Sequence, residues 1–321
     1  MIQRQPHSLA LCCLALLGLS WMAVPADGTD SADESLTPFE LDIAFTRSSF
    51  LGVNEADAIA ALKVFTRSVG RRRGYDIKPK VRIFDDMDAL KAEIDRGSQG
   101  LLIVDSWEYL TLSPGTNMPI EFSTIEQGVV REDYLLLVRT GSEVAGLTDL
   151  EGKRVRVLES SSANTGRHWL LTELMELGVT SPQAFFGDFE VSHRTSQVVL
   201  PVFFGQADAC VVDRSGFEIM DEMNPQVGKT LVVAAKSDPY LDTMICVRKG
   251  KWEHPQYRAD LLDALRELNS DPGGKQILSL FKFEGMSSFK EEHLDTVLAL
   301  RRRHDALLAR LDSPREGTGA E

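Results

Sequence analysis

Short apolar runs alternate with segments of helical periodicity along most of this chain, from residue 39 onward. The apolar runs are 39–45, 81–84, 101–104, 133–139, 154–158, 189–191, 209–212, 229–235 and 243–247, and the helical segments are 56–69, 87–95, 166–177, 195–204, 260–268 and 293–311. Strands that alternate with helices at this spacing predict parallel β-α-β units. The polar tail 312–321 lacks both patterns, and we predict that it is disordered.

Charge and composition restrict the possible partners. The 321 residues are 43% hydrophobic and 26% charged, which suits one large domain or two modest ones. The net charge of −13 argues against nucleic acid as a partner, because a phosphate backbone is bound by a basic face. We interpret the basic runs Arg71–Arg73 and Arg301–Arg303 as solvated helix faces.

The N-terminus has the pattern of a secretory signal. Arg4 supplies a positive start, residues 9–24 form a short apolar run, and small residues precede position 27. We therefore predict a signal peptide over 1–26, an acidic linker over 27–37 and a periplasmic location. A retained membrane anchor is the alternative.

Two cysteines remain once such a signal is removed, Cys210 and Cys246, and both lie in apolar runs. Export permits a disulfide between them, whereas burial as two separate thiols is the alternative. The sequence contains no Cys-x-x-Cys, His-x-x-x-His, Gly-x-Gly-x-x-Gly or Gly-x-Ser-x-Gly motif. We therefore predict no metal, no cofactor and no enzymatic activity.

A loop rich in small polar residues follows the apolar run 154–158. Ser160, Ser161, Ser162, Asn164 and Thr165 stand where the next helix begins. A helix start carries free N–H groups and partial positive charge, so this loop is suited to an anionic or oxygen-rich ligand. Simple helix capping requires only one such residue and is the alternative interpretation.

Several segments have recognisable sequences. They are GLTDLEGKRV at 146–155, SANTG at 162–166, FFG at 185–187, SH at 192–193, GQADACVVD at 205–213 and FEGMSSF at 283–289. Together they resemble the phosphate-, phosphite- and phosphonate-binding branch of the periplasmic solute-binding proteins, over residues 39–307. The pieces at 146–155 and 205–213 are shared by many solute-binding proteins, whereas His193 and the polar loop are more particular to this branch.

The resemblance implies an α/β, bilobal type II periplasmic binding protein fold, with two mostly parallel sheets joined by two hinge strands. Lobe one is expected to comprise 38–139 and 246–311, and lobe two 140–245. The hinge strands are expected near 134–138 and 243–247. Ligand is expected to bind in the cleft between the lobes and to close it.

The resemblance also implies ligand-binding residues. In lobe two these are Ser162, Asn164, Thr165, Gly166, His193 and Asp213. Where the family has a Ser-Thr-Ser-Gly turn, this chain has Ala163 and Asn164 at the first two positions, so the hydroxyl pattern is broken. A solvent-facing strand end is the alternative for His193, and capping of the next turn is the alternative for Asp213.

Lobe one is expected to contribute residues that follow its strands, at the edge of the sheet where ligands usually bind. These are Ser48, Ser49, Trp107 and Tyr109, with Tyr134 at the crossover. Core packing is the alternative for Tyr134 and for one of the two aromatic residues that follow the third strand. Arg47 and Arg167 are further possible partners of an anion, but we do not assign them to the site.

The resemblance therefore predicts a monomeric, exported binding protein that captures a small anionic ligand, such as a phosphonate, for the permease of an ABC importer. A binding protein that signals to a separate membrane sensor is the alternative. An enzyme on the same fold is the third hypothesis, and the missing catalytic motifs argue against it.

Overall fold

The computed structural model describes residues 36–112, 117–161, 163–250 and 252–312. The predicted signal peptide, Ser162 and nearly all of the predicted tail and linker lie outside the described residues. Within the described ranges, no helix is long and apolar enough to cross a membrane.

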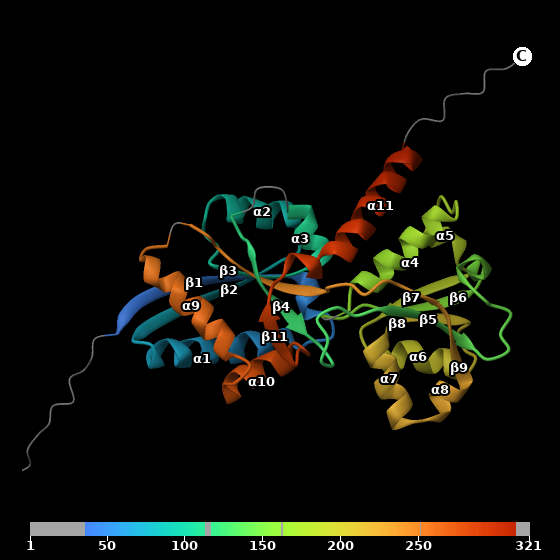
Figure 1. Cartoon of the computed structure of the whole chain (residues 1–321), viewed down its shortest axis with the longest axis horizontal. Helices are drawn as coiled ribbons and strands as arrows, with labels where there is room; N and C mark the ends of the chain where they lie inside the picture. The colour runs from blue at the N-terminus through green and yellow to red at the C-terminus, as the bar shows by residue number, and fades with distance from the viewer. Residues whose placement is uncertain (1–35, 113–116, 162, 251, 313–321) are drawn as a thin grey trace, which may run out of the picture. The chain divides into compact units, whose positions relative to one another are not determined.

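The first and last parts of the chain form a six-stranded mixed sheet in the order β11-β4-β10-β3-β1-β2 (Figure 1). Its strands are β1 (Thr37–Thr46), β2 (Tyr75–Phe84), β3 (Leu101–Asp105), β4 (Ile120–Ile125), β10 (Thr243–Val247) and β11 (Gly285–Ser288). One face is covered by α1 (Glu55–Arg72), α9 (Pro255–Glu267) and α10 (Pro272–Leu280), and the other by α2 (Met87–Asp95) and α3 (Ser106–Leu112). We call this sheet and its helices lobe one.

The middle of the chain forms a five-stranded mixed sheet in the order β7-β6-β8-β5-β9. Its strands are β5 (Tyr134–Arg139), β6 (Arg154–Leu158), β7 (Asp188–Ser192), β8 (Ala209–Asp213) and β9 (Leu231–Lys236). One face is covered by α4 (Thr165–Glu176) and α5 (Pro182–Phe185), and the other by α6 (Thr195–Phe203), α7 (Arg214–Met223) and α8 (Gln226–Thr230). We call this sheet and its helices lobe two.

Each sheet has a parallel core with antiparallel additions. β1 pairs in parallel with β2 and β3, and β6 pairs in parallel with β7 and β8. The remaining strands, β4, β5, β9, β10 and β11, pair antiparallel. The predicted α/β fold and its β-α-β units are confirmed, and both sheets are mixed.

The chain passes between the lobes in two short segments, 126–133 and 237–242. β5 pairs with β8 and β9 in lobe two, and β10 pairs with β3 and β4 in lobe one. The strands expected at the hinge are therefore regular members of one sheet each, and the crossing lies just outside them. Within the two segments, Glu132 and Tyr240 exchange both backbone hydrogen bonds at 2.8 Å, which ties the two crossings together.

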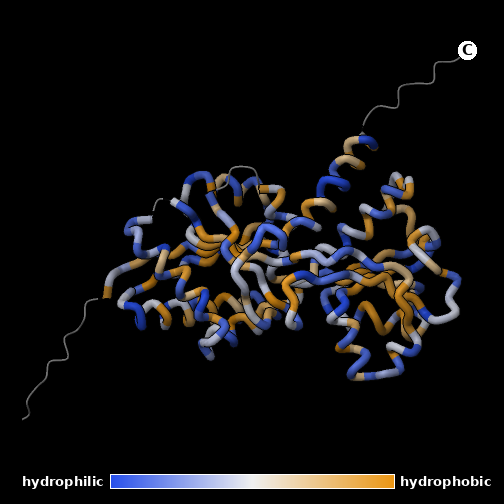
Figure 2. The backbone as a smooth tube through the Cα atoms, viewed as in Figure 1, coloured by the Kyte–Doolittle hydropathy of each residue, from blue (hydrophilic) through white to orange (hydrophobic). Residues whose placement is uncertain are grey.

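The sheets form the interior of both lobes. All five residues of β3 and of β10 are buried, as are the first five of β5. Figure 2 shows these strands as the hydrophobic part of the backbone, with hydrophilic residues concentrated in loops and on outer helix faces. Strands that are buried on both faces have near-continuous apolar sequences, which explains why these runs were recognisable in the sequence.

The C-terminal helix α11 (Asp295–Asp312) contacts both lobes. Val297 and Leu300 are buried in its packed part. Arg303 forms an ion pair with Glu173 of α4 at 2.9 Å, and Arg301 donates to Thr111 of α3 at 3.1 Å. The lobes are thus connected by this helix as well as by the two crossing segments.

Candidate functional site

The start of α4 is capped differently from four other helices of this chain. Asn54, Asp86, Asp213 and Asp271 precede α1, α2, α7 and α10, and each accepts a hydrogen bond from a backbone N–H of its own helix. Asn164 precedes α4 but makes no such bond through its side chain. The capping group of α4 therefore comes from elsewhere in the chain.

That group is the carboxylate of Asp242, at the end of the second crossing segment. Its Oδ1 accepts from the backbone N–H of Thr165 at 3.0 Å, from Thr165 Oγ1 at 2.7 Å and from the backbone N–H of Asn164 at 3.3 Å. Its Oδ2 accepts from the hydroxyl of Tyr134 at 2.8 Å. Its backbone carbonyl accepts from the N–H of Ser106, the first residue of α3, at 2.7 Å.

Asp242 is only 4% exposed, and burial raises the pKa of its carboxyl to about 6, while the hydrogen bonds from Thr165 and Tyr134 oppose that rise. The group is therefore mostly ionised at pH 7 and mostly protonated at pH 5. A helix start stabilises a carboxylate through its free N–H groups and its dipole. The anion that the polar loop was expected to bind is, in this structure, a side chain of the same protein.

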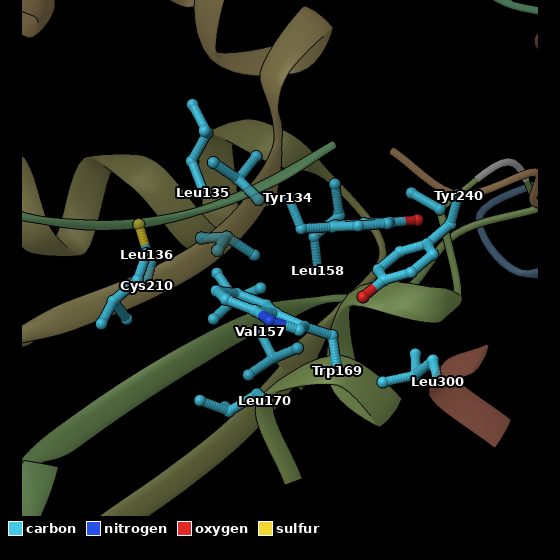
Figure 3. Packing of buried hydrophobic residues seen from close by; sticks show 14 of the residues in the cluster. Tyr134, Leu135, Leu136, Val157, Leu158, Trp169, Leu170, Cys210, Tyr240 and Leu300 are labelled. Carbon is cyan, nitrogen blue, oxygen red and sulfur yellow. The ribbon is translucent and has the colours of Figure 1, made fainter. Parts of the chain in front are cut away.

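Gly166 and Tyr134 pack directly against each other. A Cβ atom on Gly166 would lie 2.3 Å from Cδ1 of the Tyr134 ring. Tyr134 is 0% exposed, and Figure 3 shows it within the buried cluster that includes Val157, Trp169 and Tyr240. Tyr134 is thus placed in the core, where it also holds Asp242, and Gly166 makes room for its ring.

A polar cavity of about 160 Å³ lies between the lobes, beside this cluster. Its lining includes Ser160, His193 and Asp213 from lobe two, and Glu126, Lys282 and Glu284 from elements that precede or follow strands of lobe one. It is the place where His193 and Asp213, both predicted ligand-binding residues, come together. The cavity combines carboxylates with one lysine and one imidazole, so it suits a ligand with both anionic and hydrogen-bond-donating groups.

The two predicted residues in this cavity are held in defined positions. The ring of His193 is hydrogen-bonded through Nδ1 to the backbone carbonyl of Glu159 at 2.8 Å, which leaves Nε2 for another partner. Asp213 accepts from the N–H of Gly216 at 2.6 Å at the start of α7. Burial raises the pKa of Asp213, and its hydrogen bonds and the nearby Lys282 oppose that rise. Asp213 therefore caps α7 and lines the cavity at once.

Lys282 was not predicted, and its backbone is unusual. Its φ of 65° lies in the left-handed region that favours glycine, directly after the end of α10. Burial lowers the pKa of its amine, while Asp213 and Glu126 oppose that change. Within the described ranges, no hydrogen bond or ion pair engages its ammonium group. A strained backbone that places a lysine in the lining of a polar cavity is typical of a functional position.

The predicted residues of lobe one lie outside this cavity. Ser48 belongs to η1 (Arg47–Phe50) and donates to Glu108 at 2.7 Å. Ser49 is buried, and its hydroxyl has no partner among the described residues. Tyr109 is half-buried and donates to the backbone carbonyl of Met118 at 3.3 Å.

Trp107 of α3 packs against α4 and α11. Its ring stacks on His168 of α4 with centroids 4.0 Å apart, and the guanidinium of Arg301 lies 4.9 Å from its centre. His304 approaches it edge-on at 5.0 Å. Burial lowers the pKa of His168 to about 3, and the neighbouring charges of His304 and Arg167 add to this effect, so the stacked imidazole is neutral. Trp107 thus contributes to the packing between the lobes.

The two arginines that the sequence offered as further partners of an anion form ion pairs within the protein. Arg47 pairs with Asp85 at 2.6 Å, and Arg167 pairs with Glu159 at 3.2 Å.

Cys210 and Cys246 are both buried and free, in β8 and β10 of different sheets. The described residues contain no group of three or more side chains suited to a metal ion.

Comparison with known proteins identifies the family. The family model for the periplasmic substrate-binding protein of phosphonate ABC transporters matches residues 52–294. No curated protein gives a significant match to the sequence.

Solved structures of similar fold include several with TM-scores above one half. A binding protein component of an ABC phosphonate transporter from Pseudomonas aeruginosa has a TM-score of 0.57 and 13% identity, over 86% of this chain and 89% of the other. PhnD1 from Prochlorococcus marinus, in complex with methylphosphonate, has a TM-score of 0.55 and 14% identity, over 83% and 98%. A Xanthomonas citri protein bound to ATP has a TM-score of 0.60 and 15% identity, over 84% and 98%. At such identities these likenesses establish the shared fold.

Proposed function

Because this chain belongs to the family of periplasmic substrate-binding proteins of phosphonate ABC transporters, we propose that it captures a small phosphonate- or phosphate-like oxyanion between its lobes. The bound ligand is then delivered to the permease of an ABC importer. The observation that carries this proposal is the position of Lys282, whose exposed side chain lines a polar cavity between the two lobes.

The cavity supplies complementary groups for such a ligand. Lys282 offers a charge, and Nε2 of His193 offers a donor to a phosphoryl oxygen when it carries the proton. The carboxylates of Glu126, Asp213 and Glu284 favour an amine or a hydroxyl on the rest of the ligand. An aminoalkylphosphonate combines these two features in one small molecule.

The test is titration calorimetry of the mature protein with phosphate, phosphite, methylphosphonate, aminoalkylphosphonates and sulfonates. At a ligand concentration of 100 Kd, binding stabilises the protein by about 2.7 kcal/mol, so thermal shift gives an independent readout. If none of these compounds binds or stabilises the protein at millimolar concentration, the proposal is wrong.

A matched pair of lysine substitutions tests the residue that carries the proposal. Lys282→Met removes the charge from the cavity and is expected to weaken binding of the preferred compound by about 10–100-fold, the range for loss of a charged hydrogen bond. Lys290→Met is the control, because that side chain is 67% exposed and pairs only with Glu292. Equal affinities for both variants would contradict the assigned role of Lys282.

The family is periplasmic, and we propose that this chain reaches that compartment through cleavage after residue 26 and acts there as a monomer. N-terminal sequencing of the exported protein tests the cleavage, and light scattering tests the monomer. A mature chain that still begins at Met1 would support the retained anchor. The comparisons give no support to the signalling alternative.

A further inference from the structure

Four hydrogen-bond donors at or beside the α4 start converge on one internal carboxylate. The donors are the N–H groups of Asn164 and Thr165 and the hydroxyls of Thr165 and Tyr134. Asp242 accepts from all four, and it is 4% exposed. An anion from solvent that approaches these donors meets a position that is already filled.

We propose that Asp242 is a resident anion that makes the start of α4 unavailable to the ligand's anionic group, and that it thereby determines ligand specificity. This inference rests on the proposed function, since it concerns where that ligand's charge is bound. The ligand's anionic group is confined to the cavity of Lys282 and His193.

Three observations support this assignment. Asp242 lies 77 residues after Thr165 in the sequence, so the bond is made by the tertiary fold and not by local capping geometry. Its backbone carbonyl is held by the N–H of Ser106, which fixes the side chain's direction from the other end. The ordinary capping residue, Asn164, is 7% exposed and leaves its amide Nδ2 without a partner in the described structure, as expected when another residue has taken its role.

Electrostatic repulsion adds to the steric exclusion of an anion by Asp242. A second anion within a few ångströms of an ionised carboxylate is strongly disfavoured in a buried environment. The aligned positions Ala163 and Asn164 already lack the hydroxyls that this family's turn normally offers. These four donors are thus bound to a side chain of the protein, and its negative charge repels a second anion.

The experiment removes the resident carboxylate and measures binding of simple anions. Asp242→Ala empties the position, and Asp242→Ser keeps a small hydroxyl that preserves the fold if alanine does not. Inorganic phosphate, sulfate and methylphosphonate are titrated at pH 8, where the wild-type carboxylate is ionised. We expect both variants to bind at least one of these anions on the order of tenfold more tightly than wild type, because the donors become free and the like charge is lost.

Asp238→Asn is the matched control, because this exposed carboxylate lies in the same crossing segment and, among the described residues, forms no hydrogen bond or ion pair with α4. It is expected to leave anion binding unchanged. Crystals of Asp242→Ala grown with selenate locate the gained anion by its anomalous signal, which is expected at the N–H of Thr165.

The possible failures are distinguishable. If folded Asp242→Ala and Asp242→Ser bind the three anions no better than wild type, the inference is overturned. A wild-type complex with the ligand's anion on the N–H of Thr165 also overturns it and leaves the proposed function intact. If wild type binds no phosphonate while Asp242→Ala gains anion binding, the proposed function fails and the resident anion stands.

Discussion

Gly166 offers the sharpest test of how the α4 start is built. Replacement by alanine adds a Cβ atom 2.3, 2.7 and 2.9 Å from the Cδ1, Cε1 and Cγ atoms of Tyr134. Such distances are far below van der Waals contact, so the ring or the helix must move. The ring cannot rotate away at low cost, because Tyr134 is fully buried and its hydroxyl is bound to Asp242 at 2.8 Å.

The expected cost follows from these contacts. Overpacking of a closed core costs about 1–3 kcal/mol. Alanine offsets part of this, since it is favoured over glycine by up to about 1 kcal/mol in a helix interior and by less in the first turn. We therefore expect Gly166→Ala to lower the free energy of unfolding by about 0.5–2.5 kcal/mol, measured by denaturant titration. Each kcal/mol lowers the thermal midpoint by about 2–4 °C for a chain of this size.

Two further proteins complete the test. Gly146→Ala is the control, because its φ of −170° suits any residue and no atom lies within 4 Å of the added Cβ. Tyr134→Leu removes the ring, so in its background Gly166→Ala should cost much less than in wild type. Strictly additive losses in this double-mutant cycle would refute the packing argument. So would a Gly166→Ala variant that loses ligand affinity at wild-type stability, since it would indicate that the glycine serves the ligand.

Three other changes have outcomes that the structure determines. Burial raises the pKa of Asp242 from its ordinary value of 3.8 to about 6, so its contribution to stability is full below pH 4 and is lost as pH rises through 6. This contribution amounts to about 3 kcal/mol, and Asp242→Asn should remove that part of the pH dependence in unfolding titrations. Lys282→Gly should raise the free energy of unfolding by about 0.5–1 kcal/mol, because glycine suits its φ of 65°, yet weaken ligand binding; a destabilised variant would contradict the backbone argument. Cys210 and Cys246 are buried, and burial raises the pKa of both thiols, so neither should react with a thiol reagent until guanidinium unfolds the protein, and reductant should leave the thermal midpoint unchanged.

Most of the fold could be predicted because many of its strands have a recognisable apolar sequence. β3, β5, β8 and β10 are buried on both faces and are almost continuously apolar, so each is visible in the sequence by itself. β11 was missed because its sequence, Gly-Met-Ser-Ser, has no apolar pattern, and it becomes a strand only by pairing with β4. α7 was missed although its apolar residues gather on one helix face; none of its residues is fully buried.

The crossing segments show a different limit. The apolar run 133–139 was interpreted as a hinge, but its apolar character reflects burial in the centre of the lobe-two sheet between β8 and β9. The true crossings are short and polar, and their pairing through Glu132 and Tyr240 joins residues 108 positions apart. A local pattern cannot report such a contact, because both partners are ordinary loop residues in the sequence.

The site could be predicted only in part, because only some of its residues are brought together by the order of strands and helices. His193 and Asp213 directly follow or end strands of one sheet, so their convergence at one edge follows from β-α-β geometry. Lys282 follows a helix in the last third of the chain and reaches the cavity only through the tertiary fold. Its single local signal is the αL position after α10, which a glycine normally occupies and which the sequence does not mark.

The polar loop before α4 shows that a helix start can be recognised from the sequence as a place for a negative group without the sequence identifying that group. Free N–H groups and the dipole require a negative partner, and the sequence supports that requirement without naming the partner. Asp242 satisfies it from 77 residues away, with Tyr134 as the fourth donor. A ligand that reaches Thr165 must therefore offer more than the carboxylate that it displaces. The Asp242 variants measure directly how strongly this carboxylate keeps an external oxyanion away from the helix start.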